Sequence, residues 1–532
     1  MVLVDRRLRS SEGAVAGAGA TLVATALLWA AHLVQAGVPF APISIAQRAL
    51  RVIPGRVAVF FIEALGHWAL RSFVIGVLLA TLAVGAAAGA WVGRRPPEAR
   101  GRATWLAGGL LTLLAAAGWT ATPGGMSLIR YLLLAAAAGA VWVLVLRGAL
   151  DRLARDPMPA PAGGLGRTRR EFLRAAAGAG GLVLAALGVE KVLGSFGDRG
   201  GRPLARPAGA GPLAEVGVPA EPQAQRAAFE LAGLTPEVTP NGEHYTVDES
   251  IIDPDVDAST WRLRIDGLVG RPVELGYDEL LRMASAEQFV TLQCISNEVG
   301  GDLVGTARWT GVPLRDVLER AGGPGPGAVR VVFHAVGGYT DSILVATALD
   351  PATMVAYGMN GRSLPRSHGY PARIIAPGIY GMKNVKWLRR IQVVDYDYQG
   401  YWQRSGGWDN IAEIRTASRI DLPGGDEPVQ SPVTVAGVAW AGRRGIAKVE
   451  VSADGGATWR AATLRRQLAE AAWRQWRLDL DRAQLPDRPG DLRLLVRAVD
   501  GTGAVQTQAR ARPLPSGSSG WDEVRIRVVP RG

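Results

Sequence analysis

Apolar and polar positions divide the chain into two different halves. Before residue 200, long apolar runs are separated by short polar loops, whereas after about residue 240 apolar and polar residues alternate in short segments. A helix that crosses a bilayer needs roughly 20 mostly apolar residues. The first half, residues 1–195, therefore predicts a membrane region of five helices, at about residues 14–37, 72–93, 104–122, 127–146 and 175–195.

Arginines cluster in alternate loops of this membrane region. They precede the first apolar segment, separate the second from the third, and are most numerous between the fourth and the fifth. Because positively charged loops stay in the cytoplasm, the pattern predicts a multi-pass protein of the cell membrane. Its N-terminus would be cytoplasmic, and everything after residue 195 would be extracytoplasmic. Membrane topology thus accounts for the net charge of +12, and nucleic acid is not an expected partner.

The fifth apolar segment begins with a basic motif. Residues 168–174 read TRREFLR, in which Arg169 and Arg170 precede a Phe-Leu pair and a mild Gly/Ala-rich run. This pattern is typical of a twin-arginine export signal; the alternative is a basic loop beside a helix. Twin-arginine export moves folded proteins, so the motif favours an exported domain that carries a cofactor. Residues 196–240 are rich in Gly, Pro and Ala and predict a linker.

The second half predicts two further domains. The β-branched runs around residues 261–269, 329–336, 372–378 and 385–396 are typical of strands, and residues 277–283 of a helix. Residues 241–408 thus predict an α+β domain. From residue 409 to 532, short alternating strands with an Asp454-Gly455-Gly456 turn predict an immunoglobulin-like β-sandwich.

Cys294 is the only cysteine among the 532 residues. One cysteine cannot form an intramolecular disulfide, and it cannot alone hold a structural zinc or an iron–sulfur cluster. It can act as a nucleophile or give a metal one soft ligand. The alternative is a buried, inert thiol.

Three blocks in the second half resemble, in the same order, the sulfite oxidase family of molybdopterin enzymes. They are Cys294 with GTARWTGVPLRDVLERAG (305–322), the long segment 348–393, and AWAGRRGIAKVEVSADGGATW (439–459). The resemblance covers roughly residues 240–530. It implies a molybdenum–molybdopterin cofactor with Cys294 as the protein's thiolate ligand, since soft sulfur suits such a metal. It also implies that residues 409–532 form a dimerisation domain, and hence a homodimer.

The same resemblance implies a set of cofactor contacts. The matching positions are His368, Arg373, Asn384, Val385 and Lys386, with a looser match at Asn241, His244 and Tyr245. Tyr339 falls on a tyrosine near the metal in sulfite-oxidising members and would be catalytic together with Cys294. The alternatives are solvated surface charges for the basic residues, including Lys383, and an ordinary loop tyrosine.

The chain departs from the family where the substrate would bind. The segments HYTVDES (244–250) and CISNEVGG (294–301) lack the arginines of sulfite-oxidising members, and a dianion needs converging positive charge. The expected substrate is a small oxo-anion or oxo-compound. Three alternatives remain: oxidation, reduction of sulfoxide-like compounds fed by membrane carriers, or a non-catalytic exported member of the fold.

Electrons would leave through an unidentified carrier, a quinone or a cytochrome. His32 and His67 lie near the outer ends of the first two apolar segments, where two histidines could ligate a haem b. A pair of interfacial histidines beside Trp29 and Trp68 is the favoured interpretation.

Overall fold

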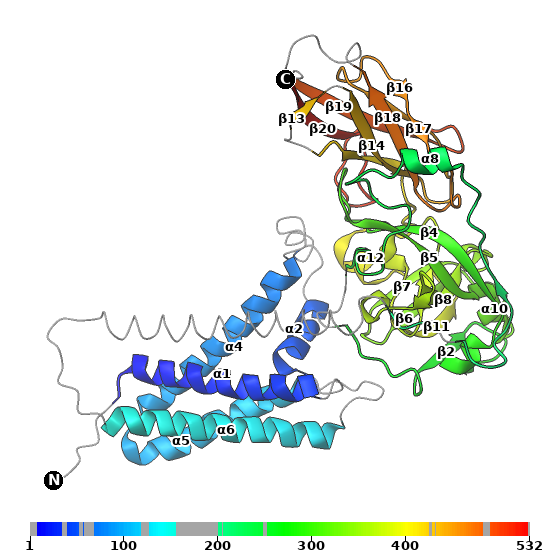
Figure 1. Cartoon of the computed structure of the whole chain (residues 1–532). Helices are drawn as coiled ribbons and strands as arrows, with labels where there is room; N and C mark the ends of the chain where they lie inside the picture. The colour runs from blue at the N-terminus through cyan, green and yellow to red at the C-terminus, as the bar shows by residue number, and fades with distance from the viewer. Residues whose placement is uncertain are drawn as a thin grey trace. The chain divides into compact units, whose positions relative to one another are not determined.

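The computed structural model describes most of the chain. The described residues are 8–34, 40–52, 57, 69–118, 127–155, 201–204, 206–247, 253–424, 428–430, 432–481 and 490–529. The chain divides into two compact units, residues 1–197 with 250–255 and residues 198–249 with 256–532 (Figure 1). The predicted fifth apolar segment, the paired arginines and His67 lie outside the described residues, as does the side chain of His32.

The first unit is helical. Its described helices are α1 (Ser10–Val34), α2 (Ala41–Val52), α4 (Ala69–Gly93), α5 (Pro97–Ala116) and α6 (Leu128–Arg155). Within the described residues, three segments are long and apolar enough to cross a membrane: Ser10–Ala31, Ser72–Gly93 and Leu128–Ala154. These match the first, second and fourth predicted segments. The third predicted segment is helical as far as Ala116, within α5, and is not among the three. The short helix α2 was not predicted.

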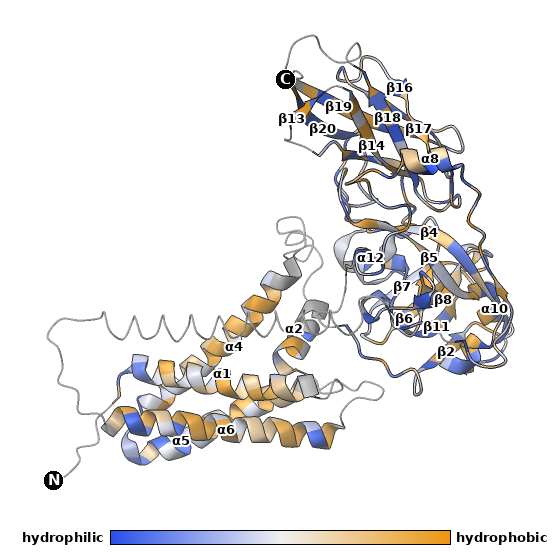
Figure 2. Cartoon of the chain, in the orientation of Figure 1, coloured by the Kyte–Doolittle hydropathy of each residue, from blue (hydrophilic) through white to orange (hydrophobic). Residues whose placement is uncertain are grey.

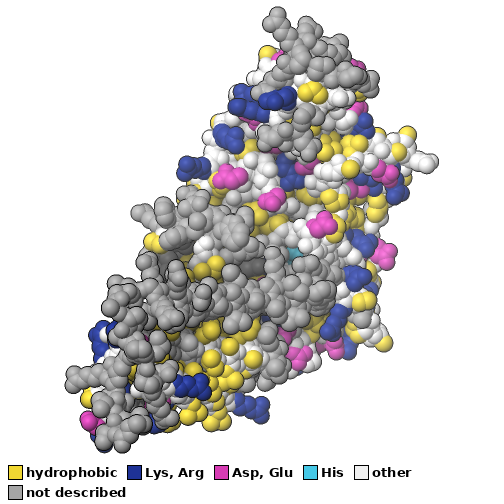
Figure 3. Space-filling view, turned by 60° about the vertical axis from the view of Figure 1, so that its left-hand side comes forward, with side chains coloured by type: hydrophobic (Ala, Val, Ile, Leu, Met, Phe, Trp, Pro, Cys, Tyr) yellow, Lys and Arg dark blue, Asp and Glu magenta, His cyan; other side chains and the backbone are white. Residues whose placement is uncertain are grey.

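Large apolar side chains on these helices face outward. Leu106 and Leu110 of α5 and Leu133 of α6 are each at least 60% exposed. Apolar residues cover the helices in Figure 2 and gather in the lower part of the space-filling view in Figure 3. Exposed apolar area of this kind is unusual on a soluble surface and suits a lipid environment.

Helices α1 and α4 pack through glycines. A Cβ atom at Gly89 would collide with the backbone of Gly13 and Gly17, and one at Gly85 would collide with Thr21. Trp142 of α6 donates its indole N–H to Thr21 Oγ1 over 2.8 Å. Small residues allow two helix backbones to approach closely, as is common between helices in membranes.

The α+β domain contains two sheets around one main core. One sheet has the order β1 (Leu213–Ala214), β4 (Ser285–Gln293), β5 (Val304–Pro313), β8 (Met354–Met359) and β10 (Arg373–Ile375), with β9 (Arg362–Ser363) on β8. The other has the order β3 (Val273–Gly276), β2 (Arg262–Gly267), β11 (Leu388–Val394), β6 (Arg330–Ala335) and β7 (Thr340–Leu344). Both sheets bury apolar residues in a shared cluster, for example Ile265, Phe333, Val355 and Ile374.

Short helices connect these strands. They are α9 (Tyr277–Leu281), α10 (Leu314–Glu319), α11 (Val345–Ala348), α12 (Tyr401–Gly406) and the 3-10 turns η2 (Arg366–His368) and η3 (Gly381–Lys383). The four predicted strands correspond to β2, β6, β10 and β11, and the predicted helix corresponds to α9. The prediction of a mixed α and β domain is therefore confirmed.

Residues 201–204 and 206–247, which we call the strap, correct the prediction of a linker. They contain β1, which pairs in parallel with β4, and α8 (Gln223–Ala228). The Trp473 indole N–H donates to Glu237 O over 2.8 Å, and Arg465 forms a 2.6 Å ion pair with Glu221. The Gly/Pro-rich composition indicated a free spacer, but polar side chains distant in sequence bind this segment along its length.

The last domain consists of two sheets that enclose a second core. One has the order β12 (Ala417–Leu422), β14 (Val433–Trp440), β18 (Arg474–Leu480) and β17 (Thr463–Leu464). The other has the order β13 (Pro428–Gln430), β20 (Asp522–Val529), β19 (Gly490–Asp500), β15 (Ile446–Ser452) and β16 (Arg460–Ala461). Val435 and Trp476 of the first sheet share an apolar cluster with Val449, Leu494 and Ile526 of the second.

Candidate active site

Cys294 follows the last residue of β4 and is buried. Its N–H donates to Leu303 O over 2.9 Å, and its Sγ lies 3.0 Å from Ser296 Oγ. Burial raises the pKa of the thiol, and hydrogen bonds with Ser296 and the Ile295 backbone offset part of that effect. The thiol therefore favours its protonated form unless a metal takes the place of the proton.

The strap carries Asn241, His244 and Tyr245, the predicted cofactor contacts with the looser family match, and brings them to the α+β domain. Asn241 Oδ1 accepts a hydrogen bond from Asn360 Nδ2 over 2.7 Å, and the Asn241 carbonyl lies 3.0 Å from His368 Nε2. The His244 ring stands edge-on to the His368 ring, with 5.3 Å between their centroids. The structure thus places His244 and Asn241 beside His368, although more than 120 positions separate them in sequence.

Both histidines are neutral at neutral pH. Burial, followed by the nearby His368 and Arg373, lowers the pKa of His244 to about 3, and burial with Arg373 lowers the pKa of His368 to about 4. His244 Nε2 is buried beside the Gly305 backbone, but it makes no hydrogen bond of ordinary geometry within the described part of the chain. A buried polar atom of this kind normally has a partner. It therefore suits a polar ligand such as the cofactor.

Arg373 links these histidines to the loop before β11. Its guanidinium donates to His368 O and Asn384 O, both over 3.1 Å, and lies 5.0 Å from the centre of the Trp309 ring. Asn384 uses its own side chain to shape the loop, because it accepts from Ala376 N over 2.7 Å and donates to Ile379 O over 3.1 Å. The Asn384 side chain thus fixes the loop, and the Asn384 carbonyl accepts the hydrogen bond that orients Arg373.

Lys386 supplies a second buried cation in this region. Its Nζ donates to Ser367 O over 3.0 Å and lies 4.4 Å from the centre of the Trp387 ring. Burial lowers the pKa of Lys386 to about 7. A bound phosphate would favour the charged ammonium. Val385, between Lys386 and Asn384, is buried in the main core, and its carbonyl accepts from Ile374 N over 2.9 Å.

The turn η3 lies beside both predicted tyrosines. A Cβ atom at Gly381 would collide with the hydroxyl of Tyr245, whose pKa is raised by burial. The Tyr339 hydroxyl lies 2.9 Å from Met382 O and 3.2 Å from Asp341 Oδ2. The proximity of Tyr339 to a metal stays a prediction.

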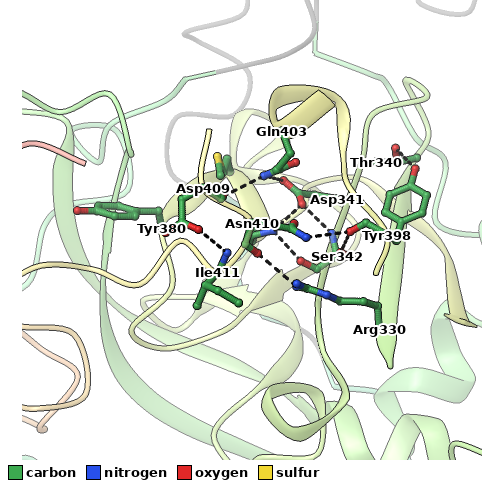
Figure 4. Close-up of polar contacts among 12 residues, drawn as sticks. Arg330, Thr340, Asp341, Ser342, Tyr380, Tyr398, Gln403, Asp409, Asn410 and Ile411 are labelled. Atoms are coloured by element: carbon green, nitrogen blue, oxygen red, sulfur yellow. Dashed lines mark hydrogen bonds and ion pairs between the residues drawn. The ribbon is translucent and has the colours of Figure 1, made fainter. Parts of the chain in front are cut away.

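Lys383, at the end of η3, is neither a surface charge nor part of the histidine cluster. Its Nζ donates to Asp341 Oδ1 and Ser342 O, both over 2.8 Å, and the two charged side chains are 1% and 0% exposed. Figure 4 shows Asp341 at the centre of a polar network that includes Gln403 and Asn410. Sequence reasoning missed this ion pair because 42 positions separate the partners and neither has a local signal.

No group of three or more His, Cys, Asp or Glu side chains that could hold a metal occurs in the described part of the chain. One thiol with a separate cluster of histidines and cations does not make an all-protein metal site. The arrangement fits a metal that is bound through its own organic ligand. The Cys294 thiolate would add one bond to the metal, and the cluster of histidines and cations would hydrogen-bond a polar group of the organic ligand.

Comparisons with known proteins identify the family. The family model described as "Oxidoreductase molybdopterin binding domain" matches residues 250–402, and the "Mo-co oxidoreductase dimerisation domain" matches residues 409–528. Sulfite oxidase from Gallus gallus is 35% identical over 329 residues, which cover 52% of this chain and 69% of that protein. The chain belongs to the sulfite oxidase family. Mitochondrial sulfite oxidase from Mus musculus is 34% identical over 341 residues, which cover 55% of this chain and 62% of the relative.

A nitrate reductase and a sulfane dehydrogenase are also similar to the chain. Nitrate reductase [NAD(P)H] from Hordeum vulgare is 34% identical over 282 residues, which cover 43% of this chain and 32% of that protein. The sulfane dehydrogenase SoxCD from Paracoccus pantotrophus superposes with a TM-score of 0.48 at 25% identity, over 56% of this chain and 82% of that chain. The chain thus spans less than two thirds of the length of the mammalian sulfite oxidases that it matches. As predicted from the sequence, its second half matches the molybdopterin-binding and dimerisation domains of molybdenum oxidoreductases.

Proposed function

We propose that the chain is a membrane-anchored oxidoreductase that transfers an oxygen atom at a molybdenum ion ligated by Cys294. The observation that carries this proposal is the combination of the buried Cys294 thiol with the buried His368 and Arg373, all within the segment that the molybdopterin family model matches. His244, on the strap before that segment, completes the buried cluster. The bound cofactor would supply the redox change and the oxygen transfer.

The residues of this chain would hold and orient that cofactor. Arg373 and Lys386 would balance the charge of its phosphate, and the neutral His244 ring would hydrogen-bond a polar group of the pterin. Asn241 and Asn384 would act mainly by fixing the histidines and Arg373, because their amide groups are engaged with the protein. Tyr245 and Val385 would shape the wall, and Tyr339 would hydrogen-bond the substrate.

The substrate would be a small oxo-anion or oxo-compound. The relatives' names include sulfite oxidases and nitrate reductases, which act on anions of this kind. The segments 244–250 and 294–301 contain no arginine that could bind a dianion, so a weakly charged substrate, such as a sulfoxide undergoing reduction, is the second candidate.

The purified full-length chain in detergent, assayed with artificial electron donors and acceptors, tests the proposal. Sulfite oxidation and the reduction of nitrate and of sulfoxides are measured in parallel for the wild type and Cys294→Ser. We expect turnover of at least one substrate, and its loss in the variant. Full turnover by Cys294→Ser would show that the thiolate role is wrong.

The anchor would consist of the apolar helices of the first unit. Three spans of sufficient length and the outward-facing leucines support membrane insertion. The catalytic domain would face the extracytoplasmic side after twin-arginine export and pass electrons to a quinone or a cytochrome. The last domain would be an immunoglobulin-like sandwich, and the match to the dimerisation model supports a homodimer. Protease digestion of intact cells tests the orientation: cleavage of the catalytic domain is expected only from the outside.

A further inference from the structure

The loop that carries Cys294 is held from outside its own domain. Gln293 Oε1, one residue before the thiol, accepts a hydrogen bond from the Trp440 indole N–H over 2.8 Å. Trp440 is the last residue of β14, in the C-terminal domain. The two side chains are 4% and 3% exposed, so this hydrogen bond is shielded from water.

Two more hydrogen bonds reach the same loop from the C-terminal domain. Ser518 Oγ donates to Asn297 O over 2.7 Å, and Arg419 Nη1 donates to Gly301 O over 2.9 Å. The three partners lie 118 to 221 positions away in sequence. Gly300, which has a φ of +77°, leaves no room for a Cβ atom against the Asp522 carboxylate. The C-terminal domain thus contacts both ends and the middle of residues 293–301.

Internal hydrogen bonds transmit this restraint to Cys294. Asn297 N donates to Cys294 O over 3.0 Å, and Asn297 Oδ1 accepts from Leu303 N over 2.9 Å. Leu303 O in turn accepts from Cys294 N over 2.9 Å. Asn297 therefore connects the Ser518 contact to the backbone on both sides of the thiol.

We propose that Trp440 and Ser518 are positioning residues that fix the sulfur of Cys294. The C-terminal domain then has a second role beside dimerisation: within one chain, it clamps the loop that presents the metal's thiolate ligand. The role of Cys294 as a metal ligand rests on the proposed function, whereas the restraint of its loop by the C-terminal domain does not.

The single cysteine makes the clamp directly measurable. In the full-length protein prepared without cofactor, iodoacetamide can react only with Cys294, and a buried thiol reacts through local opening of its loop. Trp440→Phe removes the hydrogen bond but keeps an aromatic ring. We expect the alkylation rate to rise about tenfold, which corresponds to about 1.4 kcal/mol of local opening. Ser518→Ala, a milder change, should raise the rate in the same direction.

Trp261→Phe is a matched control. Trp261 is also 3% exposed and also donates its indole N–H over 2.8 Å, to Leu388 O in the α+β domain. We expect its alkylation rate to stay at the wild-type value. Equal rates for Trp440→Phe and Trp261→Phe would overturn the inference.

A double variant separates positioning from general stability. Trp440→Phe alone leaves the buried Gln293 amide without its hydrogen-bond donor. Adding Gln293→Met removes that amide, so the double variant should regain thermal stability. The clamp predicts that alkylation stays fast, whereas a merely structural role predicts that it returns to the wild-type rate. Molybdenum retained by Cys294→Ser with unchanged sulfur ligation would refute the proposed function, while the alkylation rates would still decide the clamp.

Discussion

Replacing Lys383 by methionine tests the buried network behind η3. Lys383 and Asp341 are 1% and 0% exposed, and Nζ makes two 2.8 Å hydrogen bonds, to Asp341 Oδ1 and Ser342 O. Burial lowers the pKa of Lys383, while the Asp341 carboxylate partly restores it. Methionine keeps the length of the side chain and removes the charge. The Asp341 carboxylate would keep only neutral partners among the described residues: Ser342 N at 2.7 Å, the Tyr339 hydroxyl at 3.2 Å and Gln403 Nε2 at 3.4 Å.

The expected cost is large because one charge remains buried without its partner. Removing one member of a buried ion pair typically costs about 3–5 kcal/mol. In a domain of about 150–250 residues, each kcal/mol lowers the melting temperature by about 2–4 °C, so a decrease of about 6–20 °C is expected. The matched control is Arg493→Met, because the Arg493–Glu523 pair is 54% and 20% exposed. An exposed pair contributes at most about 1 kcal/mol.

Thermal unfolding of the full-length protein, followed by circular dichroism at pH 7, measures both variants. The double variant Asp341→Asn, Lys383→Met should lose less stability than the sum of the single changes, since the two groups interact directly. The reasoning fails if Lys383→Met lowers the melting temperature no more than Arg493→Met does.

Three further predictions concern acid stability, cofactor retention and helix packing. Burial holds the pKa of His244 at about 3 and that of His368 at about 4, below the ordinary 6.5. Below pH 6.5 the unfolded chain therefore binds protons that the folded, cofactor-free protein does not. The contribution of the two neutral histidines to folding stability is complete above pH 6.5 and is lost as the pH falls through 4. His368→Asn should flatten the acid side of the stability curve, and an unchanged acid midpoint would contradict this account. Arg373→Gln should lower the pterin content per chain by about tenfold or more, as expected for a lost charge-assisted contact; pterin fluorescence after denaturation measures it, and a wild-type content would argue against the assigned role. Gly89→Leu should destabilise the α1–α4 pair in detergent, whereas Gly76→Leu on the same helix, with open space around it, should not; equal melting temperatures would show that the close approach is unimportant.

The strands of the α+β domain could be predicted because their signal is local. Runs such as residues 329–336 and 385–396 combine β-branched residues with flanking turns, and they form β6 and β11. Three of the five predicted apolar segments form long apolar helices, and these could be predicted for the same reason, from length and hydropathy. The helix α2 was missed because its 12 residues are too short for a span and their mean hydropathy is near neutral.

The candidate site could be predicted only as far as motifs reach. His368, Arg373 and Lys386 share one segment of the chain, so a family resemblance placed them together. The pairings of Lys383 with Asp341 and of Trp440 with Gln293 join residues 42 and 147 positions apart. Such contacts depend on how the sheets and domains pack, and no local pattern encodes them. The strap was missed likewise, since its partners are distant in sequence and lie in both the α+β domain and the last domain.

Molybdenum X-ray absorption spectroscopy of the wild type and Cys294→Ser tests the central claim most directly. The account predicts about one molybdenum per chain in the wild type, and one sulfur neighbour fewer around the metal in the variant. An identical number of sulfur neighbours in both proteins would contradict the assignment of Cys294 as the ligand.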